Sequence, residues 1–360
     1  MNLLGKQRGL SLIELMIALL LSAMLLWGVL QIFDSNRNTM QMQTAFARVQ
    51  ESGRFATDLL TKEIRMADYW GCAPDKDSIQ NHLDTTDPDY SGSSAKDLYD
   101  QIGADGVGGV DNASGLTVGT VAVLDGTDTL TIRGADDACR GTGRMVPSVQ
   151  AAALHVSAQC EVDPGDVILL TNCQSGELMT VTSVQHEGGC NTTSSVNNTN
   201  NRKKTITHNT GACNQVGAID NATKALQRQY GADARILKPF ERTYFIANSG
   251  VTGEPSLYVA DTGNAAMELV PGVEDMQILY GRDADNDEVV DTWSSSAGLS
   301  AAQMEQAVAI KVQLVAASDT SVRADDLDVT DLDGETTTYT DGKLRKIYLT
   351  TSKVRNRGRL

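Results

Sequence analysis

The chain has 360 residues, of which 41% are hydrophobic, and it carries a formal net charge of −16 at pH 7. A chain of this length and composition can bury a sizeable core, which argues against disorder throughout. Its acidic surface should repel the phosphate backbone, so no nucleic-acid partner is expected.

The chain begins with a short polar leader at residues 1–9, which contains Lys6 and Arg8. An apolar run follows from residue 10 to residue 33 and contains one charge, that of Glu14. As a helix this run would be about 36 Å long, enough to span the hydrocarbon core of a bilayer. Basic residues remain on the cytoplasmic side. The sequence therefore predicts a single pass through the bacterial inner membrane, with the N-terminus in the cytoplasm and the head in the periplasm.

Two ordinary explanations of this segment fit it less well. A secretory signal peptide has a shorter apolar run and a small-x-small cleavage site beyond it, whereas this run ends in Trp27-Gly28-Val29-Leu30-Gln31. A plain signal anchor leaves Glu14 unexplained, because an unpaired ionisable group inside the bilayer costs about 2 to 3 kcal/mol or more.

The segment Arg8-Gly9-Leu10-Ser11-Leu12-Ile13-Glu14 resembles the type III signal of type IV prepilins and type II secretion pseudopilins. The resemblance implies that prepilin peptidase cuts after Gly9 and that Leu10 becomes the N-methylated first residue of the mature chain. It also implies that Glu14 aligns incoming subunits, since the free amine of Leu10 on a neighbouring subunit can pair with this carboxylate. The departure is Leu10 itself, where phenylalanine is usual.

The amphipathic segment that follows, residues 34–70, continues the helix. Residues 34 to 68 contain no proline. An apolar or small stripe recurs there at helical spacing: Phe46, Val49, Gly53, Ala56, Leu60, Ile64 and Ala67. One helix is therefore expected from Leu10 to about Ala67, with its first half in the membrane and its second half packed against a head.

The head, residues 71–360, consists of short β-rich runs separated by glycine, asparagine, aspartate and serine. The clearest pair is Ala307–Ala317, with alternating apolar residues, and Leu344–Thr351 as its hairpin partner. Further strands are expected within 121–124, 129–132, 167–170, 243–246, 256–259 and 276–280. The predicted fold class is α+β and type IV pilin-like: a long N-terminal membrane-spanning helix packed on a C-terminal antiparallel sheet.

Six cysteines lie beyond the apolar run and show no CxxC spacing: Cys72, Cys139, Cys160, Cys173, Cys190 and Cys213. An even number in an exported head favours disulfides over buried free thiols. The connectivity remains open, with Cys190 and Cys213 as the guess for a pair that closes a flexible, Asn/Thr/Ser-rich insertion near 188–214.

Charges segregate near the C-terminus. Residues 319–341 hold eight acidic side chains, and residues 343–360 hold seven basic ones with no acid. Local charge balancing across a solvated hairpin is the favoured interpretation, and a docking patch for another subunit is the alternative.

An Asp-rich loop resembles a calcium loop of the EF-hand type. It places oxygen donors at positions one, three, five, seven and nine: Asp283, Asp285, Asp287, the carbonyl of Val289, and Asp291. Two departures are Glu288, where glycine is usual, and Ser294, where a bidentate carboxylate is usual. An acidic turn without an ion is the alternative, and no other cofactor is expected.

Several blocks resemble PilW-family minor pilins of the type IV pilus: Ile64–Cys72, Tyr244–Ile246, Pro255–Tyr258, Leu269–Gln277, Leu279–Gly281 and Thr350–Arg357. The family implies a structural subunit that moves from the inner membrane to the pilus at the cell surface. There it joins other minor pilins and the major pilin to prime or cap assembly, with a large tip adhesin as a further partner.

Three alternative assignments are open. A J-type pseudopilin of type II secretion shares the signal and the long helix, but such proteins are usually much shorter. An anchored periplasmic enzyme is disfavoured because no HExxH or GxSxG frame is present. Most of the four histidines are expected to be ordinary surface residues: His82, His155, His186 and His208. An adhesive binding module is the third alternative.

Overall fold

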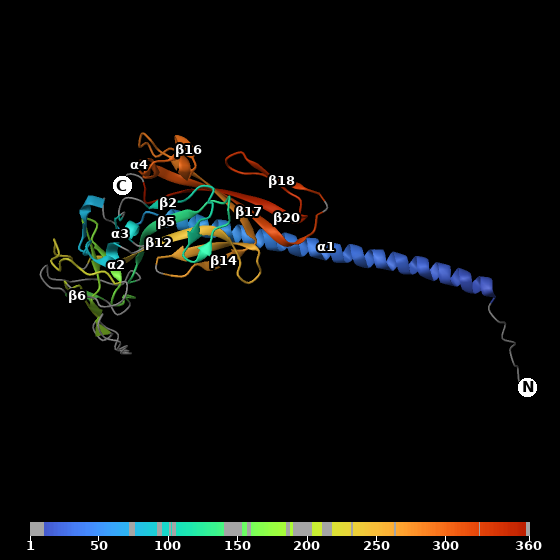
Figure 1. The fold of residues 1–360 in the computed structure, drawn as a ribbon, viewed down its shortest axis with the longest axis horizontal. Helices are drawn as coiled ribbons and strands as arrows, with labels where there is room; N and C mark the ends of the chain where they lie inside the picture. The colour runs from blue at the N-terminus through green and yellow to red at the C-terminus, as the bar shows by residue number, and fades with distance from the viewer. Residues whose placement is uncertain are drawn as a thin grey trace, which may run out of the picture.

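The computed structural model describes residues 11–71, 76–91, 96–100, 102, 106–139, 153–156, 160–184, 188–189, 204–210, 218–231, 233–262, 264–323 and 325–357. A long helix, α1 (Leu12–Met66), carries a β-rich head on its second half, and its first half projects clear of the head (Figure 1). This is the α+β, pilin-like arrangement that the sequence predicts.

Helix α1 begins and ends close to the predicted residues. Ser11 is the N-cap and forms a capping box with Glu14, which satisfies backbone N–H groups at the helix start. At the other end Asp68 adopts a left-handed backbone with φ 62°, which turns the chain out of the helix. The 55 residues between make a rod of about 83 Å.

The buried stripe of α1 runs at three- and four-residue spacing: Ala45, Val49, Gly53, Ala56, Leu60 and Ile64. Most of the predicted stripe is thus confirmed. Phe46 is an exception, because its side chain is 49% exposed and Ala45 takes the inward position instead. Three of the six residues are alanine or glycine, so the helix can lie very close to the sheet, where a phenylalanine would not fit.

The larger of the two main sheets contains eight strands. Its order is β1 (Ile79–Asn81), β8 (Gly176–Thr180), β7 (Val167–Thr171), β12 (Arg235–Asn248), β13 (Pro255–Asp261) and β14 (Met267–Pro271), with β5 (Leu130–Asp137) beside β12 and β2 (Val107–Gly108) beside β5. The head was expected to be antiparallel, and β1 and β8 depart from this because they pair in parallel.

The other main sheet has the order β16 (Thr292–Ser294), β15 (Val273–Arg282), β17 (Ala307–Ser321) and β20 (Lys343–Lys353). β17 and β20 pair in antiparallel register, with Val312 opposite Thr350, which confirms the predicted pair. Between them β18 (Leu327–Thr330) and β19 (Thr336–Tyr339) form a small hairpin of their own.

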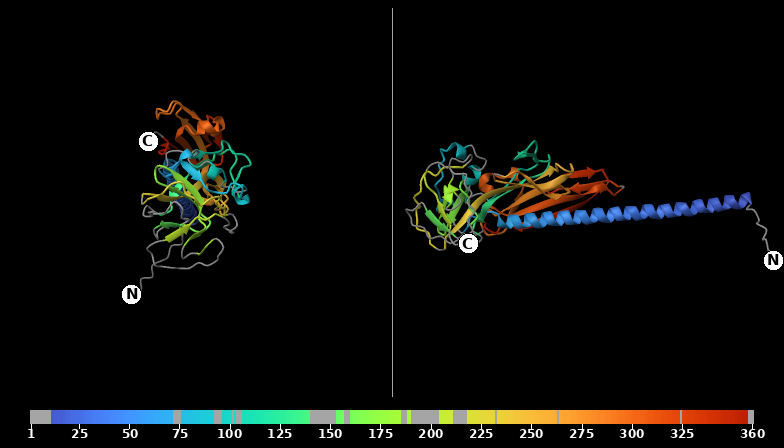
Figure 2. Two further views of the ribbon diagram at one scale, coloured as in Figure 1. Left: turned by 90° about the vertical axis from the view of Figure 1, so that its left-hand side faces the viewer. Right: turned by 90° about the horizontal axis from the view of Figure 1, so that it is seen from below.

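The main core joins α1 to both sheets. Leu60 and Ile64 of α1 share one buried cluster with Ile246 of β12, Ile278 of β15 and Leu314 of β17. Figure 2 shows α1 running lengthwise along the head. The head is therefore fixed to the helix by apolar packing along the whole buried stripe.

A distal lobe lies at the end of the head farthest from the N-terminus (Figure 1). It holds a four-stranded sheet of β10 (Gly188–Gly189), β9 (Ser183–Val184), β11 (Lys204–Thr207) and β6 (Ala153–Val156). The expected flexible insertion near 188–214 thus contains two strands within its described residues. Strand β11 is held because Ile206 is buried in the lobe's core.

Short elements complete the described head. They are η1 (Lys76–Ser78), α2 (Pro88–Ser91), α3 (Lys96–Asp100), β3 (Thr117–Val118), β4 (Val121–Ala122), η2 (Ser296–Gly298) and α4 (Ala301–Met304).

Candidate functional site

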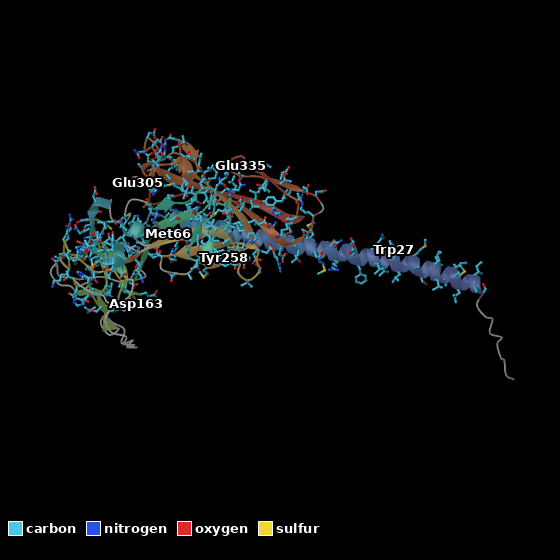
Figure 3. All side chains as sticks on the ribbon, in the orientation of Figure 1. Trp27, Met66, Asp163, Tyr258, Glu305 and Glu335 are labelled. Atoms are coloured by element: carbon cyan, nitrogen blue, oxygen red, sulfur yellow. A yellow bond between two sulfur atoms is a disulfide. The ribbon has the colours of Figure 1, made fainter. Side chains whose placement is uncertain are left out.

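The projecting half of α1 exposes its apolar side chains. From Leu12 to Phe33 the large apolar residues are between 47% and 78% exposed, and Trp27 lies on the part of the helix clear of the head (Figure 3). Among the described residues α1 is the one helix long and apolar enough to cross a membrane. An apolar surface of this extent is covered in water by lipid or by other apolar helices.

Glu14 stands at the start of this surface. Its Oε2 accepts the backbone N–H of Ser11 at 3.3 Å, and Ser11 Oγ accepts the backbone N–H of Glu14 at 3.3 Å. A carboxylate in the first turn also faces the positive end of the helix dipole. The Ser-x-x-Glu spacing of a capping box can be read from the sequence, although the cap was not among the predicted features. The predicted processing residues Gly9 and Leu10 lie outside the described residues.

The joint between α1 and β20 depends on a glycine. A Cβ at Gly53 would lie 2.0 Å from the ring of Tyr348, so any side chain there would force the ring out of place. The Tyr348 hydroxyl donates a hydrogen bond to the carbonyl of Val49 at 3.1 Å. Tyr348 therefore packs against the helix at Gly53 and is hydrogen-bonded to its backbone.

The end of α1 is held by residues close to the C-terminus. Arg357 donates from Nε to Asp68 Oδ2 at 2.5 Å and from Nη1 to the carbonyl of Met304 at 2.5 Å. Asn356 Nδ2 donates to the carbonyl of Ala67 at 2.8 Å. Two sequence blocks that are far apart in the chain, 64–72 and 350–357, thus meet in one joint.

The Asp-rich loop brings three of its predicted carboxylates together. Oxygens of Asp283, Asp285 and Asp287 lie within 4.8 Å of one another, and the negative charge of Asp287 is the main cause of a raised pKa at Asp285. Glu288 adopts a left-handed backbone with φ 68°, the conformation that glycine normally supplies at this position. Three close carboxylates can supply oxygen ligands to a hard cation.

Asp291, the fourth predicted carboxylate, is not one of the three that converge. Asp291 Oδ2 accepts the backbone N–H of Ala284 at 2.7 Å and so closes the loop. Val289 is 60% exposed, and its N–H donates to Asp287 Oδ1 at 2.8 Å. The structure therefore groups three of the four carboxylates that the sequence proposed.

The acidic and basic segments near the C-terminus balance each other less than expected. Arg345 pairs with Asp341 of the acidic segment at 2.6 Å, and equally with Glu274 at 2.6 Å. Lys343 pairs instead with Glu254 at 2.6 Å, and Lys353 with Glu288 at 3.1 Å. The basic residues mostly reach acids elsewhere in the head, so the favoured interpretation was wrong for most of the segment.

The described cysteines are oxidised, as predicted. Cys139 and Cys160 form a disulfide in the core of the distal lobe, and Cys173 is disulfide-bonded as well. No cysteine in the described part of the chain is free. Cys72, Cys190 and Cys213 lie outside the described residues.

Two histidines are buried, contrary to expectation. His82 and His208 are 2% and 1% exposed, and His82 Nε2 pairs with the buried carboxylate of Glu177. Burial, with the nearby charge of His82, lowers the pKa of His208 to about 4. Glu177 Oε1 also accepts the Tyr230 hydroxyl at 3.1 Å. The sequence held no signal for this, because the segments concerned meet only through the parallel pairing of β1 and β8. His155 is exposed, as expected, and His186 lies outside the described residues.

Comparisons with known proteins find similarity in two parts of the chain. Residues 243–356 match the family model of the type IV pilus-assembly protein W, and residues 4–30 match the prokaryotic N-terminal methylation motif. Among solved structures, a type IV-like pilin from Thermus thermophilus is similar, with 16% identity, a TM-score of 0.22, and coverage of 34% of this chain and 70% of that one. No curated protein matches the chain.

The two matched regions lie at opposite ends of the chain. The methylation motif covers the start of the exposed apolar half of α1. The assembly-protein region covers the end of β12 and the elements from β13 to β20, which include the strands β14, β15, β17 and β20 that contact α1. The chain is therefore similar to the type IV pilus-assembly protein W in the C-terminal part of its head and to the prokaryotic N-terminal methylation motif at the start of its long helix.

Proposed function

We propose that this protein joins other minor pilins and the major pilin in a complex that primes or caps assembly of the type IV pilus. The observation that carries the proposal is the projecting half of α1, which is apolar, exposed on all sides and free of the head. In the inner membrane lipid would cover it, and in the pilus the equivalent helices of neighbouring subunits would replace the lipid.

The carboxylate of Glu14 would set the axial position of each subunit relative to its neighbour. Prepilin peptidase would cut after Gly9, and the new amine of Leu10 on one subunit would meet Glu14 of the next. The structure supports this step in that Glu14 has no cationic partner among the described residues and lies on an exposed helix turn. A buried ion pair between two subunits would form only at one axial offset.

Deletion of the gene, followed by complementation with the full chain, tests the proposal. We expect the deletion strain to lose surface pili while protein secretion remains normal, and the other minor pilins to co-purify with the complementing chain. Normal pili together with lost secretion would instead assign the chain to a type II secretion pseudopilus.

We also propose that Asp283, Asp285 and Asp287 bind a calcium ion. Their convergence supports this, and the affinity expected for such a loop is weak, about 10⁻⁴ to 10⁻³ M. Calorimetric titration of the full chain in detergent should show one site that Asp285→Ala with Asp287→Ala abolishes. The matched control is Asp325→Ala with Asp326→Ala, which removes two exposed charges elsewhere. If no heat of binding is detected at calcium concentrations several times higher than this, the loop is an acidic turn that binds no ion.

A further inference from the structure

Strand β20 ends the sheet that contains β15, β16 and β17, and it is a long edge strand of 11 residues. The other strands that end the two main sheets are short: β1 and β16 have three residues each, β2 has two, and β14 has five and ends in Pro271. Native proteins keep edge strands short, or interrupt them with proline or a bulge, because an open edge pairs with other strands. Among the described edges of these sheets, β20 is therefore the one that offers a long pairing surface.

Every second residue of β20 turns its backbone groups away from the sheet. The N–H of Val354 donates to the carbonyl of Val308 at 2.9 Å, and the register runs from there to Arg345 without a bulge. In an antiparallel pair, residues bonded to the partner alternate with residues whose N–H and C=O point outward. The outward set in the centre of β20 is Ile347, Leu349 and Thr351. No described residue accepts a hydrogen bond from their N–H groups.

Two large apolar side chains flank these outward backbone groups. Ile347 and Leu349 are 44% and 60% exposed. Both lie on the face of β20 opposite to that of Tyr348, whose ring contacts α1 at Gly53. A strand added at this edge would cover both side chains and also form main-chain hydrogen bonds, which is how extended peptides are recognised by sheet edges.

The two lysines of the strand's exposed positions do not close the edge. Lysine on an edge strand discourages pairing. Here Lys346 Nζ lies 5.1 Å from the centroid of the Tyr348 ring, on the face that contacts α1. Lys353 Nζ pairs with Glu288 Oε2 at 3.1 Å, near the end of the strand. Both side chains are held by a neighbour, so the central residues 347–351 remain open.

The direction of α1 argues against a second copy of this chain as the partner. α1 and β20 lie side by side (Figure 1) and run in the same direction, because Tyr348 bonds to Val49 and Asn356 bonds to Ala67. All pairings within this sheet are antiparallel. Two β20 strands paired in that way would point their two α1 helices in opposite directions, whereas subunits anchored in one membrane have parallel helices. The added strand therefore comes from a head with a different strand direction.

The charge around β20 indicates the composition of that strand. Residues 343–360 hold seven basic side chains and no acid. Complementary charge favours the correct partner and disfavours a basic one. A strand that alternates apolar residues with acidic ones fits both the exposed side chains and the surrounding charge.

We propose that the edge of β20 pairs antiparallel with such a strand from the head of a different pilin subunit. The inference rests on the proposed function, because it assigns a contact within the minor-pilin complex. The added strand covers Ile347 and Leu349 and takes up the outward hydrogen bonds in the centre of β20.

Hydrogen exchange of single backbone amides tests the pairing. The samples are the full chain alone in detergent, and the complex that co-purifies with it from cells that make the other pilins, with each subunit identified by mass. We expect the outward amides of Ile347, Leu349 and Thr351 to exchange at least about tenfold more slowly in the complex. The amides of Tyr348 and Thr350 bond to β17 and should exchange slowly in both samples, which makes them the internal control.

A proline variant tests the same edge in a second way. The N–H of residue 349 does not bond to β17, and proline is accepted where an edge strand faces solvent, so Leu349→Pro should keep the sheet folded. We expect recovery of pilin partners to fall at least about tenfold, because the added strand would be left with an unsatisfied carbonyl. The matched control, Leu349→Val, keeps the N–H and an apolar side chain and should recover partners as the unmodified chain does.

A further variant keeps every backbone group and removes the apolar cover. Ile347→Ser with Leu349→Ser should also reduce recovery of partners, so the proposal remains testable if the proline variant does not fold.

Outward amides that exchange equally fast in the free chain and in the complex would overturn the proposal, as would full recovery of partners by both edge variants. Protection that rises with the concentration of the free chain alone would overturn it in favour of a second copy. If the edge variants and the unmodified chain recover pilins equally, the proposed function stands and the edge pairing fails. Recovery of no pilin by the unmodified chain would overturn the proposed function and this contact with it.

Discussion

In the proposed assembly, Glu14 would have two separable tasks at the start of α1. It accepts a hydrogen bond from its own Ser11, and its carboxylate remains exposed to other subunits. The first task belongs to the folded chain and the second to the assembly.

We predict that Glu14→Leu is inserted and processed but does not enter the minor-pilin complex, because leucine cannot pair with a neighbour's amine. Insertion should become easier once the charge is removed. Ser11→Ala is the control, since it breaks the capping box at a cost of about 1 kcal/mol or less and keeps the carboxylate. Pilus counts and co-purification of minor pilins measure the effect. Equal loss in both variants would mean that capping, not pairing, is what assembly needs.

Asp275 makes the head sensitive to pH. Burial raises its folded pKa to about 6, above the unfolded value of roughly 3.9, so the folded state holds a proton that the unfolded chain has released. Its contribution to stability therefore falls as pH rises between about 4 and 6. His208 acts in the opposite sense, because its folded pKa of about 4 lies below that of an unfolded histidine.

We expect Asp275→Asn to raise the free energy of unfolding by about 1 to 3 kcal/mol near pH 8 and to change it little near pH 4. The amide oxygen can still accept the hydrogen bond from Gln277, so this contact is kept. Thermal melts of variant and unmodified chain at each pH isolate this group from His208. A stabilisation that is the same at both pH values would contradict the assigned cause.

At the scale of elements, the contact between α1 and β20 predicts a contrast between two glycines of the same helix. Gly53→Ala should lower the melting temperature by several degrees, because the new Cβ collides with Tyr348 and overpacking costs about 1 to 3 kcal/mol. Gly28→Ala meets no atom within 4 Å and gains helix propensity, so it should be neutral or stabilising. If both variants melt alike, Tyr348 does not pack where the structure places it.

The elements that the sequence predicted are those with a strong local period. The long helix could be read to within two residues at its start, and β17 with its partner β20 could be read from alternation and from the turn residues between them. These patterns reflect which face of each segment contacts a core, so they can be recognised without knowledge of the fold.

The elements that were missed depend on partners far away in the chain. The parallel pairing of β1 with β8 buries His82 against Glu177. The sequence around either residue gives no sign of this pairing. The choice of Ala45 over Phe46 depends on how closely the helix approaches the sheet.

At the scale of the whole molecule, maturation should expose the N-terminus that assembly uses. We predict that the mature chain begins at Leu10, and that Gly9→Val remains uncut, since the peptidase needs a small residue beside the scissile bond. Intact mass measures both. The uncut variant should stay in the membrane without forming pili. Cleavage within the apolar run of the unmodified chain would contradict this.

Because α1 is long, a small tilt of its N-terminal half produces a large displacement of the head. In bilayers such helices tilt by about 20° on average, and over a rod of about 83 Å that angle displaces the far end by roughly 28 Å. Residues 34 to 44 are exposed, so the head does not bury the helix before Ala45. A subunit anchored by this helix would therefore carry its head through a distance of roughly 28 Å as the helix tilts by about 20°.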